Sequence, residues 1–191
     1  MKKAIILHGM SDNKQSYYNP DGDAESNSHW LPWLQKQLIV RDVLAQTPEM
    51  PEPHMPNYEK WCSVFNQFKI DEETDLIGHS CGAGFLLRWL TENKQKVRKV
   101  VLVAPWVDPT NELGDQNTFF NFEIDAGLAE RTSSVYIFNS SNDDEVIHES
   151  VKRILEKLPS AQLIEMKNKG HFTFSGMSTR KFPELAATLL E

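Results

Sequence analysis

Residues 74–90 read Thr-Asp-Leu-Ile-Gly-His-Ser-Cys-Gly-Ala-Gly-Phe-Leu-Leu-Arg-Trp-Leu, and they contain the most informative motif of the chain. An apolar run leads into Gly78-His79-Ser80-Cys81-Gly82, and a run with helical character follows it. A Gly-x-Ser-x-Gly between a buried strand and a helix is the pattern of a nucleophile elbow, a turn that exposes a serine hydroxyl. The two glycines let strand, turn and helix pack without clashes between Cβ atoms. Such a short pattern recurs by chance, so its interpretation depends on the rest of the chain.

The rest of the chain alternates apolar runs with amphipathic stretches of helical length. Apolar runs that lack strict alternation and are separated by helices indicate a parallel sheet covered on both faces. The pattern predicts one domain over residues 1–191, a three-layer α/β/α sandwich with a mostly parallel sheet of about six strands. The expected strands are 3–8, 41–47, 75–79, 98–104, 134–139 and 161–166, and the expected helices are about 30–38, 58–68, 81–94, 146–157 and 181–190.

Two segments are less regular. Residues 11–28 are polar and rich in turn formers, and their acidic part is expected to be a solvated loop rather than a calcium site. Residues 106–132 carry several phenylalanines but little strand character. This second segment is expected to cover the core as a loop plus a helix, or else to form a short cap beside a site. Whether either segment gates a site stays open.

Composition narrows the classes of function. The formal net charge of -7 over 191 residues argues against nucleic acid and anionic membranes as partners. No apolar run approaches the roughly 20 residues of a membrane span. The apolar run after Lys2 and Lys3 is shorter than the roughly 7–15 residues of a signal peptide. The chain has two cysteines, Cys62 and Cys81, which are too few for a disulfide framework and are expected to be reduced. We therefore predict a cytoplasmic protein.

A serine nucleophile needs a base within reach and an acid that orients the base. In a parallel sheet these groups gather in the loops that follow the carboxyl ends of the strands. The run 140–145, Ser-Ser-Asn-Asp-Asp-Glu, follows the fifth expected strand, and Gly170-His171 follows the sixth. The order Ser80, aspartate, His171 matches that of hydrolases with a nucleophile elbow. This conjunction supports a catalytic triad.

The chain resembles the compact α/β-hydrolase family of serine hydrolases, which contains the retinoblastoma-binding serine hydrolase and the bacterial YdeN-type proteins. The resemblance covers nearly the whole chain. It implies an α/β-hydrolase fold without a large lid and hydrolysis of an ester-like or amide-like bond. The segments that carry it are 5–9 (Ile-Ile-Leu-His-Gly), 29–34 (His-Trp-Leu-Pro-Trp-Leu), 78–82, 142–147 (Asn-Asp-Asp-Glu-Val-Ile) and 170–172 (Gly-His-Phe).

The family pattern also suggests which aspartate is the acid of the triad. It places an apolar residue three positions after the acid, usually followed by proline. From Asp144 that apolar residue is Ile147, and from Asp143 it is Val146. Asp144 is favoured and Asp143 is then a solvated loop carboxylate. The proline is replaced by His148, which leaves the register open by one residue.

The expected mechanism assigns the remaining roles. His171 takes the Ser80 proton, and Asp144 holds the imidazole. The oxyanion hole is expected from the Cys81 backbone N–H and, by position after the first strand, from the Met10 N–H. The side chain of Cys81 should point away from the site. Residues expected to line the pocket are His8, Gly9, His79 and Trp106.

The sequence thus favours a carboxylesterase-like serine hydrolase that acts on a small acyl substrate and needs neither metal nor cofactor. The resemblance also allows a protein partner. Two alternatives stay open: a hydrolase-fold protein-binding module with little activity, and another acyl-group enzyme on the same triad, such as a thioesterase, peptidase or acyltransferase.

Overall fold

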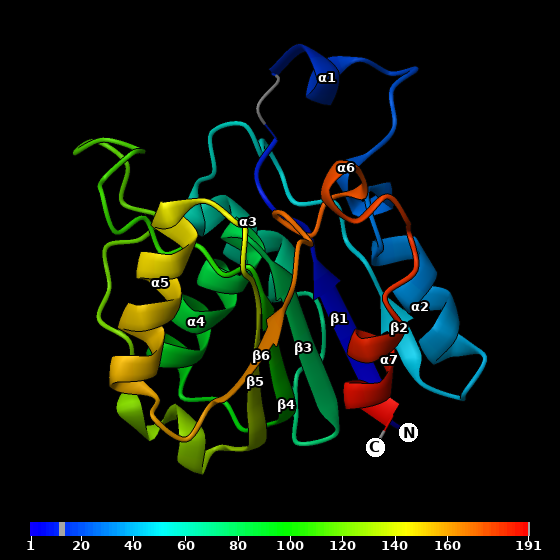
Figure 1. The fold of residues 1–191 in the computed structure, drawn as a ribbon, viewed down its shortest axis with the longest axis vertical. Coiled ribbons are helices and arrows are strands. Elements are labelled where there is room, and N and C mark those ends of the chain that lie inside the picture. Colours follow the sequence, from blue (N-terminus) through cyan, green and yellow to red (C-terminus); the bar gives the residue numbers. More distant parts are fainter. Residues whose placement is uncertain (12–13, 191) are drawn as a thin grey trace.

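Six parallel strands form one sheet in the order β2-β1-β3-β4-β5-β6 (Figure 1). The computed structural model describes residues 1–11 and 14–190, so residues 12 and 13 of the expected loop 11–28 lie outside the described residues, as does residue 191. The parallel sheet of six strands confirms the predicted fold class. The strands are β1 (Lys3–Leu7), β2 (Leu44–Gln46), β3 (Thr74–His79), β4 (Val97–Val103), β5 (Thr132–Ser140) and β6 (Gln162–Met166).

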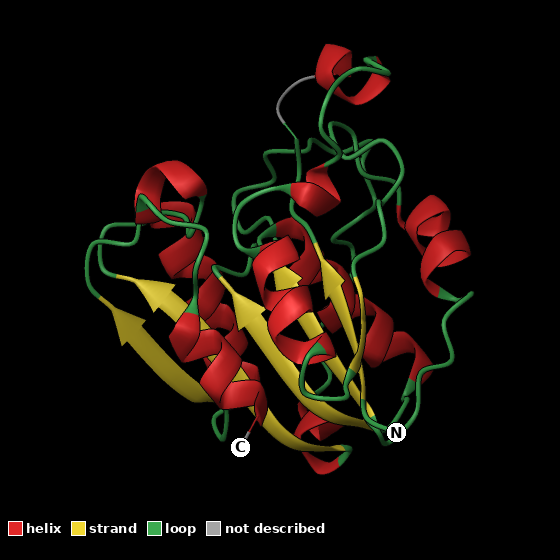
Figure 2. Cartoon of the chain, turned by 90° about the vertical axis from the view of Figure 1, so that its right-hand side faces the viewer, coloured by secondary structure: helices red, strands yellow, loops and turns green. Residues whose placement is uncertain are grey.

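Helices cover the sheet on both faces (Figures 1 and 2). This explains why every residue of β3 is buried, including the polar Thr74, Asp75 and His79. The helices α2 (Leu31–Ile39) and α7 (Pro183–Leu190) lie on one face. On the other face lie α3 (Tyr58–Phe65), α4 (Cys81–Asn93) and α5 (Glu145–Lys157).

Some short elements differ from the prediction. The second strand spans only three residues, because Asp42 turns the chain with a φ of 60° just before it. Three helices were not predicted, since pieces of at most five residues are too short to show a hydrophobic period. They are α1 (Lys14–Tyr18), η1 (Glu25–Asn27) and α6 (Phe174–Met177). The helix expected with the loop of residues 106–132 is the short η2 (Ala126–Glu130).

The segment between β4 and β5 covers part of the core. Its Phe119 is 1% exposed and packs edge-on against Trp61, with ring centroids 5.1 Å apart. Such aromatic pairs contribute about 0.5–1.5 kcal/mol beyond the area that they bury. Apart from η2, the segment has no helix or strand between the two sheet strands. It therefore closes the core without forming a large lid.

The strand order creates a crevice at the carboxyl ends of β1 and β3. From β1 the chain runs to β2 on one side, and it then returns to β3 on the other side, which is a topological switch point. Leu7 at the end of β1 pairs with Gly78 in β3. The residues that follow these two strands, around His8 and Ser80, therefore meet at one place.

Candidate active site

Ser80 occupies a strained turn between β3 and α4. Its φ of 53° and ψ of −120° are rare for a residue with a side chain. Backbone hydrogen bonds hold it there. The Ser80 N–H donates to the Val103 carbonyl at 2.9 Å, and the Ser80 carbonyl accepts from the N–H groups of Ala83 at 3.0 Å and Trp106 at 3.2 Å. The predicted nucleophile elbow is therefore present as a backbone conformation.

The glycines of the elbow are required by close packing. A Cβ atom on Gly78 would lie 2.5 Å from the Ala83 nitrogen, and one on Gly82 would lie 2.3 Å from the His8 carbonyl oxygen. Real Cβ atoms do not approach backbone this closely, so both positions need glycine. On the β1 side, a Cβ on Gly9 would lie 3.0 Å from the Ser80 Cβ. The loop after β1 therefore lies directly beside the serine.

His171 is paired with Asp143. Its Nδ1 lies 3.0 Å from Asp143 Oδ1 and 3.1 Å from Oδ2, and the Asp143 side chain is 1% exposed. The expectation that Asp144 would hold the imidazole is wrong for this geometry. Asp144 is the exposed residue before α5, and its own backbone N–H donates to Asp143 Oδ1 at 2.8 Å.

The register of the two strand exits explains this one-residue correction. Ser140 Oγ accepts from the Lys169 N–H, and Asn142 Oδ1 accepts from the Gly170 N–H, both at 2.9 Å. These bonds fix the loop after β5 against the loop after β6. The next residue, Asp143, then faces the ring of His171.

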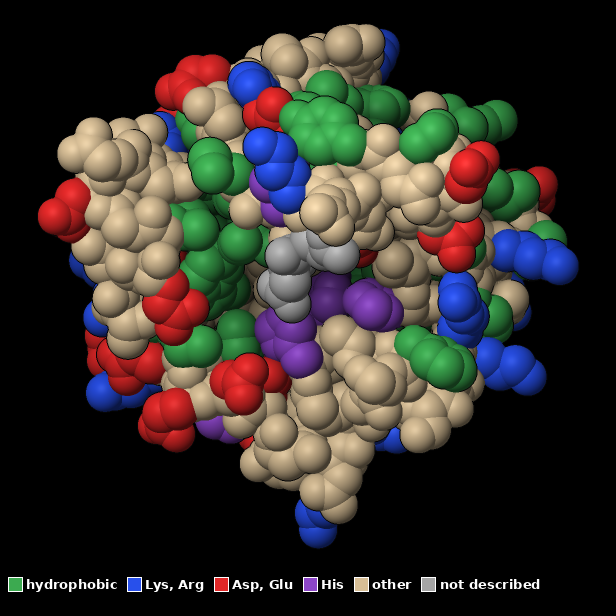
Figure 3. All heavy atoms as spheres, turned by 90° about the horizontal axis from the view of Figure 1, so that it is seen from above, with side chains coloured by type: hydrophobic (Ala, Val, Ile, Leu, Met, Phe, Trp, Pro, Cys, Tyr) green, Lys and Arg blue, Asp and Glu red, His purple; other side chains and the backbone are tan. Residues whose placement is uncertain are grey.

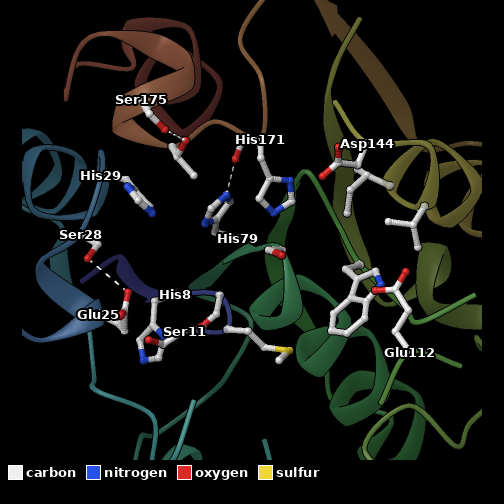
Figure 4. A pocket seen from close by; sticks show the side chains of 17 residues that line it. His8, Ser11, Glu25, Ser28, His29, His79, Glu112, Asp144, His171 and Ser175 are labelled. Carbon is white, nitrogen blue, oxygen red and sulfur yellow. Dashed lines mark hydrogen bonds between the residues drawn. The ribbon is translucent and has the colours of Figure 1, made fainter. Parts of the chain in front are cut away.

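Ser80 and His171 line the same cavity, which has a volume of about 540 Å³ (Figure 4). It opens at the carboxyl ends of the strands, where histidine side chains gather around a hollow on the surface (Figure 3). The four expected pocket residues lie on its wall, together with Met10 and Asp144. These four residues are His8, Gly9, His79 and Trp106.

Two backbone N–H groups are available beside the serine. Neither the Met10 N–H nor the Cys81 N–H donates to another described residue. Cys81 is also the first residue of α4, where the helix dipole favours negative charge. The Cys81 side chain is buried, and burial raises the pKa of its thiol well above the ordinary value. A thiolate nucleophile at Cys81 is therefore disfavoured.

Sequence reasoning missed part of the wall. The sequence gives His29 no role in the pocket, yet its ring lies 5.7 Å from that of His79. His29, His79 and His171 follow one another across the cavity (Figure 4). The backbone of His29 has a φ of 56°, and no sequence pattern indicates this conformation. Glu25 and Glu112, from the two irregular segments, also line the cavity.

Two buried histidines of the wall are neutral. His79 Nε2 lies 2.8 Å from the His171 carbonyl oxygen, and because a carbonyl only accepts, Nε2 carries the proton. Burial lowers the pKa of His79 well below its ordinary value, and the nearby His171 and His29 lower it further. Burial also lowers the pKa of His8, against the opposing effect of Glu49. Both side chains are at most 3% exposed.

These shifts predict that acid destabilises the fold. The unfolded chain takes up protons on His8 and His79 near their ordinary pKa of 6.5, whereas the native state does so only at lower pH. The free energy of unfolding is expected to fall below pH 6.5, by up to about 1.4 kcal/mol per pH unit for each histidine. Urea unfolding at pH 7.5, 6.5 and 5.5 measures this slope. His79→Gln, which keeps a donor for the His171 carbonyl, should make it shallower, and an unchanged slope would contradict the assignment.

Other kinds of site find no support in residues 1–11 and 14–190. Within these ranges, no three histidine, cysteine, aspartate or glutamate side chains are grouped as a metal would require. No helix there has both the length and the apolar character needed to cross a membrane.

Comparison with known proteins identifies the family of this chain. A family model described as "Serine hydrolase" matches residues 20–189. The Bacillus subtilis (strain 168) protein YdeN, described as a hydrolase, is 30% identical over 177 residues, which cover 90% of this chain and 86% of YdeN. Serine hydrolase RBBP9 of Rattus norvegicus is 25% identical over 182 residues, with 89% and 87% of the two chains covered.

Solved structures show the same fold. The crystal structure of the B. subtilis ydeN gene product matches with a TM-score of 0.80 and 25% identity, over 100% of this chain and 97% of that one. Est1E from Butyrivibrio proteoclasticus with bound ferulic acid matches with a TM-score of 0.71 over 100% and 88% of the chains, but at 13% identity it shows the fold alone. From the family match and the identity with YdeN, we conclude that this chain belongs to the serine hydrolase family and has an α/β-hydrolase fold.

Proposed function

We propose that this protein hydrolyses an ester-like bond of a small acyl substrate through an acyl-enzyme on Ser80. The observation that carries the proposal is the Asp143–His171 pair, whose histidine shares one cavity with a serine held in a nucleophile elbow. Asp143 replaces Asp144 as the acid of the proposed triad.

The chemistry proceeds in two halves. His171 Nε2 takes the Ser80 proton while Oγ attacks the carbonyl carbon, and the Asp143 carboxylate stabilises the imidazolium. The N–H groups of Met10 and Cys81 bind the oxyanion of the tetrahedral intermediate. The imidazolium then gives its proton to the leaving alcohol, and the acyl group stays on Ser80. Water, deprotonated by His171, attacks this ester, the bond to Ser80 Oγ breaks, and the imidazolium returns the proton to Oγ as the carboxylic acid leaves.

The cavity wall suggests which substrates fit. Trp106, Val146 and Ile147 provide apolar surface for a short acyl chain. The charged lining is acidic, since Glu25, Glu112 and Asp144 contribute carboxylates and the described lining includes neither lysine nor arginine. A carboxylate on the substrate would meet repulsion of about 1 kcal/mol for each pair at 4 Å in water. We therefore expect neutral or cationic acyl esters to be preferred over anionic ones.

A panel of p-nitrophenyl esters tests this preference. Acetate and butyrate should be hydrolysed with a higher kcat/KM than octanoate, and the anionic hemisuccinate should be roughly fivefold poorer than butyrate, as one repulsive pair implies. Glu112→Gln should reduce the difference between hemisuccinate and butyrate. A preference for hemisuccinate would contradict the proposed role of the acidic wall.

Trapping of the intermediate tests the proposed reaction. Acid-quenched samples taken during turnover should show a protein mass raised by one acyl group, located on the peptide that contains Ser80. Thioesters and anilides with the same acyl groups would compare the related activities. Absence of turnover with every ester and thioester would contradict the proposed function.

A further inference from the structure

We propose that His8 is a positioning residue that orients the Gly9–Met10 peptide so that the Met10 N–H faces the oxyanion. This inference rests on the proposed function, because it assigns His8 a role in the same reaction. His8 acts through the backbone and does not touch the reacting atoms.

The hydrogen bonds of His8 determine where its proton lies. Nδ1 is 2.7 Å from the Gly9 carbonyl oxygen, and since that oxygen only accepts, Nδ1 carries the proton. Nε2 is 2.8 Å from the Met50 nitrogen and accepts from its N–H, so Nε2 has no proton. One neutral tautomer satisfies both contacts.

Peptide planarity connects the Gly9 carbonyl to the Met10 N–H. The Gly9–Met10 peptide is trans, so its C=O and N–H point in opposite directions. By holding the Gly9 oxygen, the imidazole also sets the direction of the Met10 N–H. The same loop lies beside the nucleophile, since a Cβ on Gly9 would be 3.6 Å from Ser80 Oγ. Rotation of this peptide would remove one donor from the proposed oxyanion hole.

The surroundings hold the imidazole itself in place. His8 is 2% exposed, and its ring lies edge-on to Trp61 with centroids 5.8 Å apart. The charged and titratable groups around it are Glu49, whose Oε2 is 3.8 Å from Nε2, together with Glu25 and His79. Protonation of Nε2 would place its N–H against the Met50 N–H, so acid would break that contact and release the ring.

Two substitutions at His8 separate orientation of the peptide from simple packing. His8→Asn keeps a donor near the Nδ1 position, for Gly9, whereas His8→Gln keeps an acceptor near the Nε2 position, for Met50. We expect kcat to fall by up to about 100-fold in His8→Gln, the scale of one lost oxyanion donor, with KM nearly unchanged. His8→Asn should retain much more of kcat. His148→Asn, on α5 and outside the cavity lining, is the matched control.

A larger loss of kcat in His8→Asn than in His8→Gln would overturn the inference. Equal losses of kcat in both variants, in proportion to their loss of thermal stability, would also overturn it. A second measurement needs no variant. Nitrogen-15 NMR of the wild-type protein at neutral pH should show His8 protonated on Nδ1 and bare on Nε2, and the other tautomer would overturn the inference. Absence of ester turnover by the wild type would instead contradict the proposed function, which separates the two failures.

Discussion

Ser80→Ala is expected to lower kcat for p-nitrophenyl butyrate by about 10⁵–10⁶-fold, the scale seen when a triad nucleophile is removed. The substitution deletes only the hydroxyl. The Ser80 backbone bonds to Val103, Ala83 and Trp106 do not involve Oγ, so the elbow should persist. Circular dichroism and thermal unfolding should therefore resemble those of the wild type.

Ser63→Ala is the matched control, because Ser63 is exposed on α3 and its hydroxyl bonds only to the Lys60 carbonyl in the same helix region. It should keep full activity. Retention of most activity by Ser80→Ala would mean that the reaction does not use this serine.

Asp143→Asn is expected to lower kcat by about 10⁴-fold, the scale for the acid of such a triad. The carboxylate lies within hydrogen-bond distance of His171 Nδ1, and in the proposed mechanism it stabilises the imidazolium. An asparagine amide can turn its N–H₂ toward Nδ1, which places the imidazole proton on Nε2, where it blocks the removal of the serine proton. The neighbouring Asp144→Asn should retain most of kcat, because within the described residues its exposed carboxylate makes no hydrogen bond to His171 and contributes only to the charge of the wall.

The two variants carry the same Asp-to-Asn change at neighbouring positions. The ratio of their kcat values therefore shows which of the two carboxylates orients His171. A larger loss in Asp144→Asn than in Asp143→Asn would restore the acid expected from the sequence. Similar small losses in both variants would mean that neither carboxylate orients the base.

The sheet and the elbow could be predicted from the sequence because both depend on local patterns. The run before Gly78 is buried on both faces of the sheet, and the close contacts of Gly78 and Gly82 exclude any larger side chain. Ser80 and His171 each follow an expected parallel strand, so both could be placed at the carboxyl end of the sheet. For these features, local sequence and tertiary structure agree.

The identity of the acid could not be predicted in the same way. It depends on bonds from Ser140 and Asn142 to backbone 29 and 28 residues away, and periodicity does not resolve the ends of strands to one residue. The family spacing favoured Asp144, although Val146 also satisfies the apolar position when counted from Asp143. His29 and Glu25 reach the cavity from a loop whose path no sequence pattern sets.

The most direct test of the account is reaction of the folded protein with a fluorophosphonate probe, followed by mass spectrometry of the adduct. The probe phosphonylates a serine that is activated by a base and stabilised by an oxyanion hole. We predict one adduct per chain, located on Ser80, and much slower labelling of Asp143→Asn. No labelling of the wild-type protein, or equal labelling of Ser80→Ala, would contradict the account.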